Sequence, residues 1–176
     1  KAIKPGGLVA GSRVRSKRLK KEGVVVKVDD TGGEALVELL QQEGFPPKVI
    51  IGRDTRESGK WLEKALFQGV GAKAGEAVSA GIIPTSAVSF LTKMYKYSAG
   101  IVISASHNPF QDNGIKIFSS TGMKIPEAWE KRLEESIQAN QRKVEPEILS
   151  IVPGPTLGQK YTEFLLSRFP EEINTK

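Results

Sequence analysis

The hydrophobic and polar positions along this chain alternate between two patterns, one typical of buried strands and the other of amphipathic helices. Short uninterrupted runs of apolar, often β-branched residues indicate strands that are covered on both faces. Longer segments carry apolar residues at a spacing of three and four, which places them on one side of a helix. The predicted strands are residues 24–28, 48–52, about 77–78, 100–103 and 114–118, and the predicted helices are 34–42, 58–70, 86–95, 127–141 and 161–168.

The order of these elements predicts the fold class. From the N-terminus the order is βαβαβαββα, and helices that connect parallel strands must pass over one face of the sheet. We therefore expect an α/β fold, a three-layer domain with a mostly parallel sheet covered by helices. A turn is expected at residues 29–33, and Asn113-Gly114 should form a tight turn that folds the last two strands toward each other.

The chain length and one biased segment predict the domain organisation. The 176 residues are enough for one domain of ordinary size with a full hydrophobic core. Proline and glycine are concentrated in residues 142–160, which is typical of a linker. We expect residues 1–150 to form one domain, and residues 151–176 to be a linker and the start of a second.

The formal net charge of +6 is unevenly distributed along the chain. Residues 1–28 hold nine Lys and Arg against one Glu, whereas the remainder holds seventeen against nineteen acidic residues. A basic arm of this kind is able to bind polyanions, although most short charge runs are only solvated. Aromatic residues that would stack on bases are not interleaved with it, which disfavours nucleic acid as the partner.

The rare residues restrict the possible metal sites and the cellular location. The chain has no cysteine and a single histidine, which excludes disulfides and the usual zinc ligand sets and leaves oxygen ligands for a hard cation such as Mg²⁺. No apolar run reaches the roughly 18 residues of a membrane span. A cytoplasmic protein without a membrane partner is the expectation.

The candidate chemistry is concentrated in residues 104–109, Ser-Ala-Ser-His-Asn-Pro, between two predicted strands. Loops held by strands often carry catalytic groups. In an extended segment the side chains of Ser106 and His107 would leave opposite faces, which argues against a Ser–His nucleophile pair. A serine without a partnered base suits a phosphoryl carrier, and Lys116, which alternates with the core-facing Ile115 and Ile117, is a candidate for proton transfer or for neutralising phosphate.

A second candidate segment is residues 52–59, between a buried strand and a helix. Ligands gather at this end of the strands in open α/β sheets. Arg53 and Arg56 are candidate phosphate ligands, and Asp54 is placed to orient one of them. The alternative is an Asp–Arg ion pair that only ties the turn, and the segment taken alone favours that alternative.

Taken together, these segments resemble the α-D-phosphohexomutase superfamily, most closely the N-terminal domain of bacterial phosphoglucosamine mutases. The resemblance is carried by residues 100–118 around the serine loop, Gly-Arg-Asp-Thr-Arg-x-Ser-Gly at 52–59, Pro84-Thr85 before an apolar helix, and residues 157–165. It covers about residues 48–170. Residues 1–30 are atypical, because the Phe-Gly-Thr-Asp-Gly-Ile-Arg-Gly string that usually opens the family is not found there.

The resemblance implies a phosphoserine isomerase that interconverts glucosamine 6-phosphate and glucosamine 1-phosphate through a bisphosphorylated intermediate. It implies that Ser106 is phosphorylated, that His107 and Lys116 assist proton transfer, and that Mg²⁺ binds the serine phosphate. Arg53, Asp54, Arg56 and Asn108 would bind phosphate or support the site. The chain would then be the first of four domains, and inactive alone.

The residues alone leave other functions open. A phosphomannomutase or phosphoglucomutase would share the serine loop. A serine hydrolase would need a distant base, and the single His107 does not supply one. A non-catalytic module whose basic arm binds polyanions is the third possibility.

Overall fold

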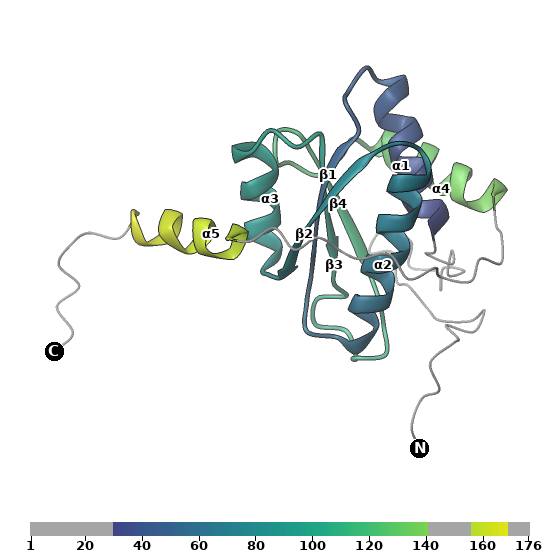
Figure 1. Cartoon of the computed structure of the whole chain (residues 1–176). Coiled ribbons are helices and arrows are strands. Elements are labelled where there is room, and N and C mark those ends of the chain that lie inside the picture. The colour runs from purple at the N-terminus through teal and green to yellow at the C-terminus, as the bar shows by residue number, and fades with distance from the viewer. Residues whose placement is uncertain (1–29, 141–155, 169–176) are drawn as a thin grey trace, which may run out of the picture.

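The computed structural model describes residues 30–140 and 156–168 of the chain (Figure 1). The elements in these two ranges are α1 (Asp30–Gln42), β1 (Lys48–Arg53), α2 (Glu57–Ala72), β2 (Glu76–Ile82), α3 (Thr85–Met94), β3 (Ala99–Ile103), β4 (Ile115–Ser119), α4 (Glu127–Ala139) and α5 (Leu157–Leu166). No helix in these ranges is sufficiently long and apolar to span a bilayer.

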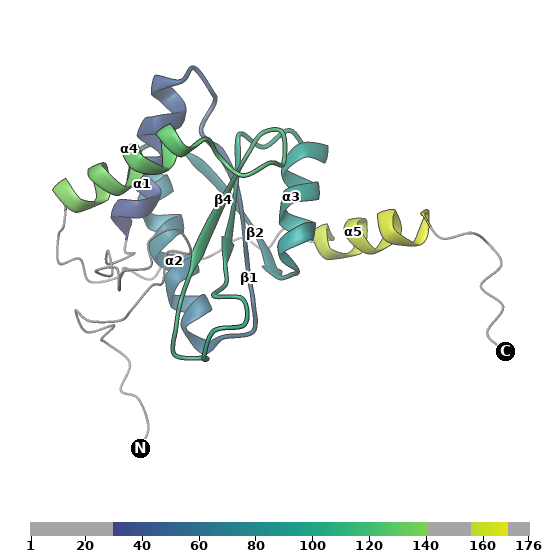
Figure 2. The same ribbon diagram turned by 180° about the vertical axis from the view of Figure 1, so that it is seen from behind.

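The strands form one four-stranded sheet in the order β2-β1-β3-β4. The pairs of β1 with β2 and with β3 are parallel, and β4 returns antiparallel to β3. Helices α1, α2 and α4 cover one face, while α3 covers the other with α5 on its outer side (Figures 1 and 2). The expected three-layer α/β domain with a mostly parallel sheet is therefore confirmed.

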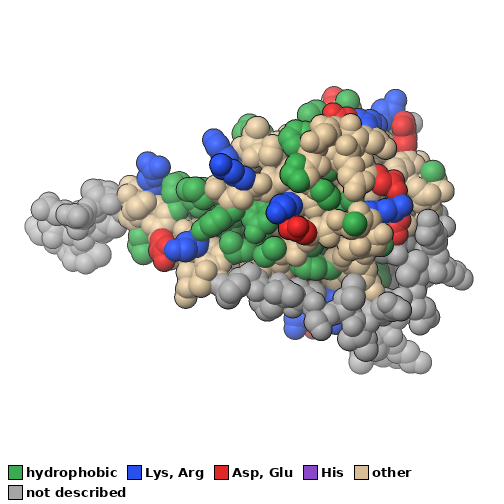
Figure 3. Space-filling view, turned by 45° about the horizontal axis from the view of Figure 1, so that its top comes forward, with side chains coloured by type: hydrophobic (Ala, Val, Ile, Leu, Met, Phe, Trp, Pro, Cys, Tyr) green, Lys and Arg blue, Asp and Glu red, His purple; other side chains and the backbone are tan. Residues whose placement is uncertain are grey.

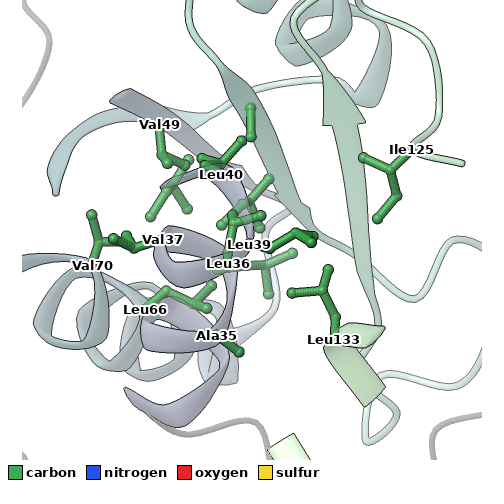
Figure 4. Close-up of a cluster of buried hydrophobic side chains, with 14 of the residues drawn as sticks. Ala35, Leu36, Val37, Leu39, Leu40, Val49, Leu66, Val70, Ile125 and Leu133 are labelled. Carbon is green, nitrogen blue, oxygen red and sulfur yellow. The ribbon is translucent and has the colours of Figure 1, made fainter. Parts of the chain in front are cut away.

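Two hydrophobic clusters hold the layers together. The larger cluster lies under α1, α2 and α4 and includes Val49, Ile51 and Ile101 from the central strands (Figure 4). The smaller cluster lies under α3 and includes Ile50 and Val102 from the same strands. Because successive strand residues point to opposite faces, strands buried on both faces are apolar throughout.

The sheet register determines which segments meet at the carboxyl edge. Arg53 is aligned with Ile103 on one side and with Ile82 on the other. The backbone N–H of Asp54 continues the ladder by donating to the carbonyl of Ile103 at 3.0 Å. The segment after β1 and the loop after β3, residues 104–114, therefore lie side by side at the lower edge of the molecule in Figures 1 and 2.

The boundaries of two predicted elements are wrong. Residues 30–33, expected in a turn, form the first turn of α1. Gly33 is needed there because a Cβ would lie 2.7 Å from the backbone nitrogen of Val70 in α2, so the glycine that suggested a turn instead permits close helix packing. The last helix begins at Leu157 rather than Tyr161, so residues 157–160 are helix and not linker.

The other helices and strands predicted between residues 34 and 140 are confirmed, with boundaries that differ by a few residues. The tight turn expected at Asn113-Gly114 is wrong: neither residue has a positive φ, and the two strands that it should join are connected by the longer loop of residues 104–114. The strand predicted at 24–28 and most of the predicted linker, 142–155, lie outside the described residues. The division into residues 1–150 and 151–176 stays a prediction.

Candidate active site

The loop of residues 104–114 joins β3 to β4 at the carboxyl edge of the parallel strands. Its two ends are pinned, because the N–H of Ser104 donates to the carbonyl of Gly114 at 2.8 Å. A Cβ at position 114 would also lie 2.8 Å from the carbonyl oxygen of Ser104, so only glycine allows this approach. The side chains of Ser106 and His107 between these ends are exposed to solvent.

Ser106 has a left-handed backbone conformation, with φ at 59°. Non-glycine residues adopt this region rarely, and mostly where the surroundings hold them there. The N–H of Ser106 donates to the hydroxyl oxygen of Ser104 at 3.1 Å, and the N–H of Asn108 donates to the carbonyl of Ala105 at 3.2 Å. The backbone therefore turns sharply at the serine and projects it from the loop.

This turn corrects the prediction about Ser106 and His107. Their side chains do not point to opposite faces: Ser106 Oγ lies 3.0 Å from His107 Nδ1, within hydrogen-bonding distance. The prediction assumed an extended backbone, and the left-handed φ at Ser106 removes that assumption. A neutral imidazole nitrogen at this distance is able to accept the hydroxyl proton.

Arg56 joins the segment after β1 to the serine loop. Its guanidinium donates to the backbone carbonyls of Pro109 at 2.7 Å, Ser106 at 3.0 Å and Asn108 at 3.1 Å. Its Nε donates to Oδ2 of Asp54 at 3.0 Å. Arg56 thus binds the loop through its backbone. Asn108, which lies in the loop, takes part through its carbonyl and its N–H.

Asp54 is held as a carboxylate by its neighbours. Burial alone would raise its pKa, but hydrogen bonds from the Arg56 N–H, the Ser104 side chain and the Arg56 guanidinium outweigh burial and lower the pKa below its ordinary value of 3.8. The Ser104 hydroxyl therefore connects Asp54 to the N–H of Ser106. The Asp54–Arg56 ion pair, which was the alternative expected for this segment, is present. Arg56 also donates hydrogen bonds to the serine loop.

Arg53 points to a different network, inside the protein. Its Nε donates to Oε2 of Glu63 in α2 at 2.8 Å, and Oε1 of Glu63 accepts from the hydroxyl of Ser79 in β2 at 2.5 Å. Arg53 therefore ties α2 and β2 to the end of β1.

Lys116 lies in β4 opposite Val102, and its side chain is exposed. Ile115 and Ile117 pack against the larger hydrophobic cluster, so the predicted alternation along β4 is confirmed. In residues 30–140 and 156–168 the ammonium group of Lys116 has no hydrogen bond or ion pair. It is a cation near the start of β4 that is available to a ligand.

Sequence reasoning did not identify four residues whose side chains form hydrogen bonds in or beside the two candidate segments: Ser58, Glu63, Ser104 and Asn113. The hydroxyl of Ser58 in α2 donates to the amide oxygen of Asn113 and pins the far end of the loop. Glu63 carried a usable signal, because it is an acidic residue between Leu62 and Leu66 on a helix that packs against the sheet. Ser58, Ser104 and Asn113 carried none beyond their position in the two motifs.

The described residues do not by themselves form a site for Mg²⁺. They contain no group of three or more His, Asp or Glu side chains arranged to hold a metal ion. Asp54, the carboxylate beside the serine loop, is already paired with Arg56. A phosphate on Ser106 would add one ligand of the roughly six that Mg²⁺ requires.

The fold and this loop define the class: a three-layer α/β/α domain that presents a serine at the carboxyl edge of its sheet. Residues 12–144 match the family described as phosphoglucomutase/phosphomannomutase, alpha/beta/alpha domain I. The chain belongs to this family, which confirms the resemblance to the phosphohexomutase superfamily.

Curated relatives are similar over most of the chain. It is 41% identical over 146 residues to a phosphoglucosamine mutase from Syntrophus aciditrophicus, which covers 81% of the chain and 32% of the relative. It is 53% identical over 92 residues to a phosphoglucosamine mutase from Ruminiclostridium cellulolyticum, which covers 52% of the chain and 20% of the relative. The chain thus spans at most about a third of the length of these relatives.

Solved structures show the same fold. A putative phosphomannomutase from Thermus thermophilus matches with a TM-score of 0.69 and 26% identity, covering 83% of this chain and 32% of that one. A phosphoglucomutase/phosphomannomutase family protein from Burkholderia thailandensis matches with a TM-score of 0.59 and 26% identity, covering 69% and 28%.

Proposed function

We propose that this chain is the serine-bearing part of a phosphohexomutase, an isomerase that interconverts glucosamine 6-phosphate and glucosamine 1-phosphate. The observation that carries the proposal is the placement of Ser106. Its hydroxyl is exposed on a loop at the carboxyl edge of the parallel strands, beside an imidazole nitrogen at 3.0 Å. Ligands of open α/β sheets bind at this edge.

The proposed reaction uses Ser106 as a phosphoryl donor and acceptor. In the first transfer, the 1-hydroxyl of glucosamine 6-phosphate loses its proton to solvent as its oxygen attacks the phosphorus of phospho-Ser106, the P–Oγ bond breaks, and glucosamine 1,6-bisphosphate forms. After this intermediate reorients, Ser106 Oγ attacks the 6-phosphate, the bond from phosphorus to the sugar 6-oxygen breaks, that oxygen takes up a proton from solvent, and glucosamine 1-phosphate leaves. The serine ends the cycle phosphorylated, as it began.

His107 and Lys116 are the proposed proton and charge partners. The imidazole of His107 accepts the proton of Ser106 when Oγ attacks, and returns it when Oγ leaves. The ammonium group of Lys116, exposed on the adjacent strand, neutralises charge on the transferred phosphoryl group. Asp54, Arg56 and Asn108 support the loop in this proposal, and Arg53 supports the end of β1, through the contacts described above.

The sugar is proposed from the relatives. The relatives from Syntrophus aciditrophicus and Ruminiclostridium cellulolyticum are phosphoglucosamine mutases, which favours a phosphorylated hexosamine as the substrate. A phosphomannomutase is the second candidate, because the similar structure from Thermus thermophilus is described as a putative phosphomannomutase. These activities would be separated by comparing the turnover of glucosamine, mannose and glucose phosphates by the longer protein of which this chain is proposed to be a part.

Mg²⁺ is proposed as the cofactor, with the phosphate of Ser106 as its only ligand among the described residues. The other ligands would have to come from water or from residues outside the described ranges. Binding of Mg²⁺ to this chain is therefore expected to be weak, and to require phosphorylation of Ser106.

A serine hydrolase is disfavoured by the environment of His107. In a catalytic triad the second imidazole nitrogen is oriented by a carboxylate or amide. Within the described part of the chain, the other ring nitrogen of His107 has no such partner. The polyanion-binding alternative depends on residues 1–28, which lie outside the described residues.

The proposal is tested by locating phosphate in the longer protein. Peptide mass spectrometry should find phosphate on Ser106, and Ser106→Ala should abolish mutase turnover in a coupled assay. Ser136→Ala, on α4 away from the loop, is the matched control and should keep full activity. Unchanged turnover in Ser106→Ala would refute the proposed function.

The same assay applied to residues 1–176 alone should detect no turnover. Catalysis depends on groups from several elements being positioned around one substrate, and this chain spans a third or less of its matched relatives.

A further inference from the structure

We propose that Arg56 is a positioning residue: it holds the peptide between Ser106 and His107 in one orientation, which leaves the backbone N–H of His107 to bind the phosphoryl group of Ser106. The inference rests on the proposed function, because it assumes that Ser106 carries this group. It assigns Arg56 to the loop and not to the phosphate, and it names a backbone donor as the phosphate ligand.

Most of the hydrogen-bond donors of the Arg56 side chain are already in use. A guanidinium has five N–H donors, and the Arg56 side chain makes four hydrogen bonds, to Asp54 and to the three loop carbonyls. The side chain is only 11% exposed. An incoming phosphate would have to break these bonds to reach the guanidinium, so Arg56 is poorly suited to be its ligand.

The orientation of the Ser106 carbonyl fixes that of the His107 N–H. In a planar trans peptide the C=O and the following N–H point in opposite directions. The carbonyl of Ser106 points to Nη2 of Arg56 at 3.0 Å, so the N–H of His107 points away from Arg56. That N–H has no hydrogen-bond partner within residues 30–140 and 156–168.

The backbone of Ser106 has an unfavourable conformation that its hydrogen bonds have to maintain. Ser106 has a φ of 59°, which serine adopts rarely. Its two backbone polar groups are both engaged, the N–H by the Ser104 hydroxyl and the carbonyl by Arg56. Loss of the Arg56 bond would let the peptide rotate toward a commoner conformation and would carry the His107 N–H with it.

Lysine at position 56 would not replace arginine. A lysine ammonium keeps the positive charge, but it is a compact group and does not present the planar fork that reaches several acceptors at once. Arg56→Lys therefore separates the two possible roles: a residue that acts through charge on phosphate tolerates it, and one that positions the loop by directed hydrogen bonds does not.

The first experiment measures how firmly the loop is held. Phe110, in the middle of the loop, is 72% exposed, and chymotrypsin can cut after it only when the loop opens locally. Both Arg56→Ala and Arg56→Lys should raise the rate of this cut at least about tenfold. Arg132→Ala, which removes a guanidinium that bonds Glu43 and Gln42 at the opposite edge of the sheet, should leave the rate unchanged.

The second experiment observes the His107 N–H directly. Phosphoserine is incorporated at position 106 by genetic code expansion, and amide resonances are recorded at pH 8 with and without the phosphate. In the wild-type chain and in Arg132→Ala, the His107 amide proton should move downfield when Ser106 is phosphorylated. In Arg56→Lys this shift should be lost, although the melting temperature is retained within a few degrees.

The outcomes are decisive for the positioning role. Cleavage of Arg56→Lys at the wild-type rate, or an unchanged phosphate-induced shift of the His107 amide in that variant, would overturn it. If Arg56→Ala does not fold, Arg56→Lys carries the test alone. Neither measurement depends on turnover, so a failed positioning role is distinguished from a failed mutase proposal, which is decided by phosphate on Ser106 in the longer protein.

Discussion

The Nε of Arg53 lies 2.8 Å from Oε2 of Glu63, and the two side chains are 13% and 4% exposed. The carboxylate also accepts from the hydroxyl of Ser79, so α2, β1 and β2 are joined by one buried polar network. Breaking a buried ion pair on one side leaves an unpaired charge, which is far more costly than losing the pair as a whole.

Glu63→Ala should therefore destabilise the chain by about 3–5 kcal/mol, measured by urea unfolding. Glu63→Gln, which still offers an oxygen to Arg53, should cost about 1–3 kcal/mol. The control is Glu134→Ala on the exposed side of α4, which should change stability by less than about 0.5 kcal/mol. Equal effects for Glu63→Ala and Glu134→Ala would show that the network adds nothing.

Gly100→Ala should destabilise the chain by about 1–3 kcal/mol through overpacking. A Cβ at position 100 would overlap the hydroxyl oxygen of Thr92 and lie 3.1 Å from Cγ1 of Val88, both in α3. Gly71→Ala in α2, where a Cβ meets nothing within 4 Å, should instead stabilise the chain by about 0.5–1 kcal/mol. Thermal melts of the two variants should move in opposite directions.

The lowered pKa of Asp54 predicts a pH dependence of stability. Because its folded pKa lies below the ordinary 3.8, its ionised form stabilises the folded chain above that pH, and the contribution is lost as pH falls through the folded value. Asp54→Asn should cost about 1–2 kcal/mol at pH 7 and less at pH 3. Urea unfolding at both pH values tests this, and a constant difference between wild type and variant would contradict it.

In the longer protein, His107→Asn should lower kcat by about 10² to 10⁴ while the melting temperature is retained. The imidazole is exposed and contacts Ser106 Oγ, so its loss removes a proton acceptor without opening the core. Gln111→Ala, an exposed substitution in the same loop, is the control and should keep full kcat. A His107→Asn variant with normal turnover would exclude the proposed proton transfer.

Helix α5 is held to α3 chiefly by aromatic contacts, at the grouped hydrophobic side chains on the left of Figure 3. The rings of Phe90 and Phe164 stack with centroids 4.0 Å apart, and the hydroxyls of Tyr161 and Ser86 lie 2.8 Å apart. Phe164→Ala should speed hydrogen exchange in residues 157–166 about tenfold while the melting temperature of the core stays within a few degrees. Leu166→Ala, at a position 65% exposed, should leave exchange unchanged.

The layer architecture was predictable because its signal is local. Apolar runs such as Val49-Ile50-Ile51 and the helical spacing in α2 follow directly from which faces are buried. The turn predicted at residues 29–33 was wrong because Gly33 allows close packing against α2. A contact between segments far apart in the chain does not appear in the local sequence pattern.

The candidate site, too, was only partly predictable from the sequence. Its chemistry was visible in the sequence, since a serine, the single histidine and the Arg-Asp-x-Arg segment stand in recognisable strings of residues. The distance between Ser106 and His107 was predicted wrongly, because local reasoning took the backbone as extended where φ is 59°. The peptide that follows Ser106 is bound by Arg56, a residue fifty positions earlier in the chain, and local reasoning does not include such a contact.

The sequence by itself determined which side chains this protein brings to its serine loop and which runs of residues build the sheet. Only the tertiary structure decided what each polar group does: Arg56 binds loop carbonyls, Arg53 pairs with Glu63, and Ser106 faces His107. The physical reason is that hydrogen-bond partners far apart in the chain are selected by strand register and helix packing, which no short window of sequence contains.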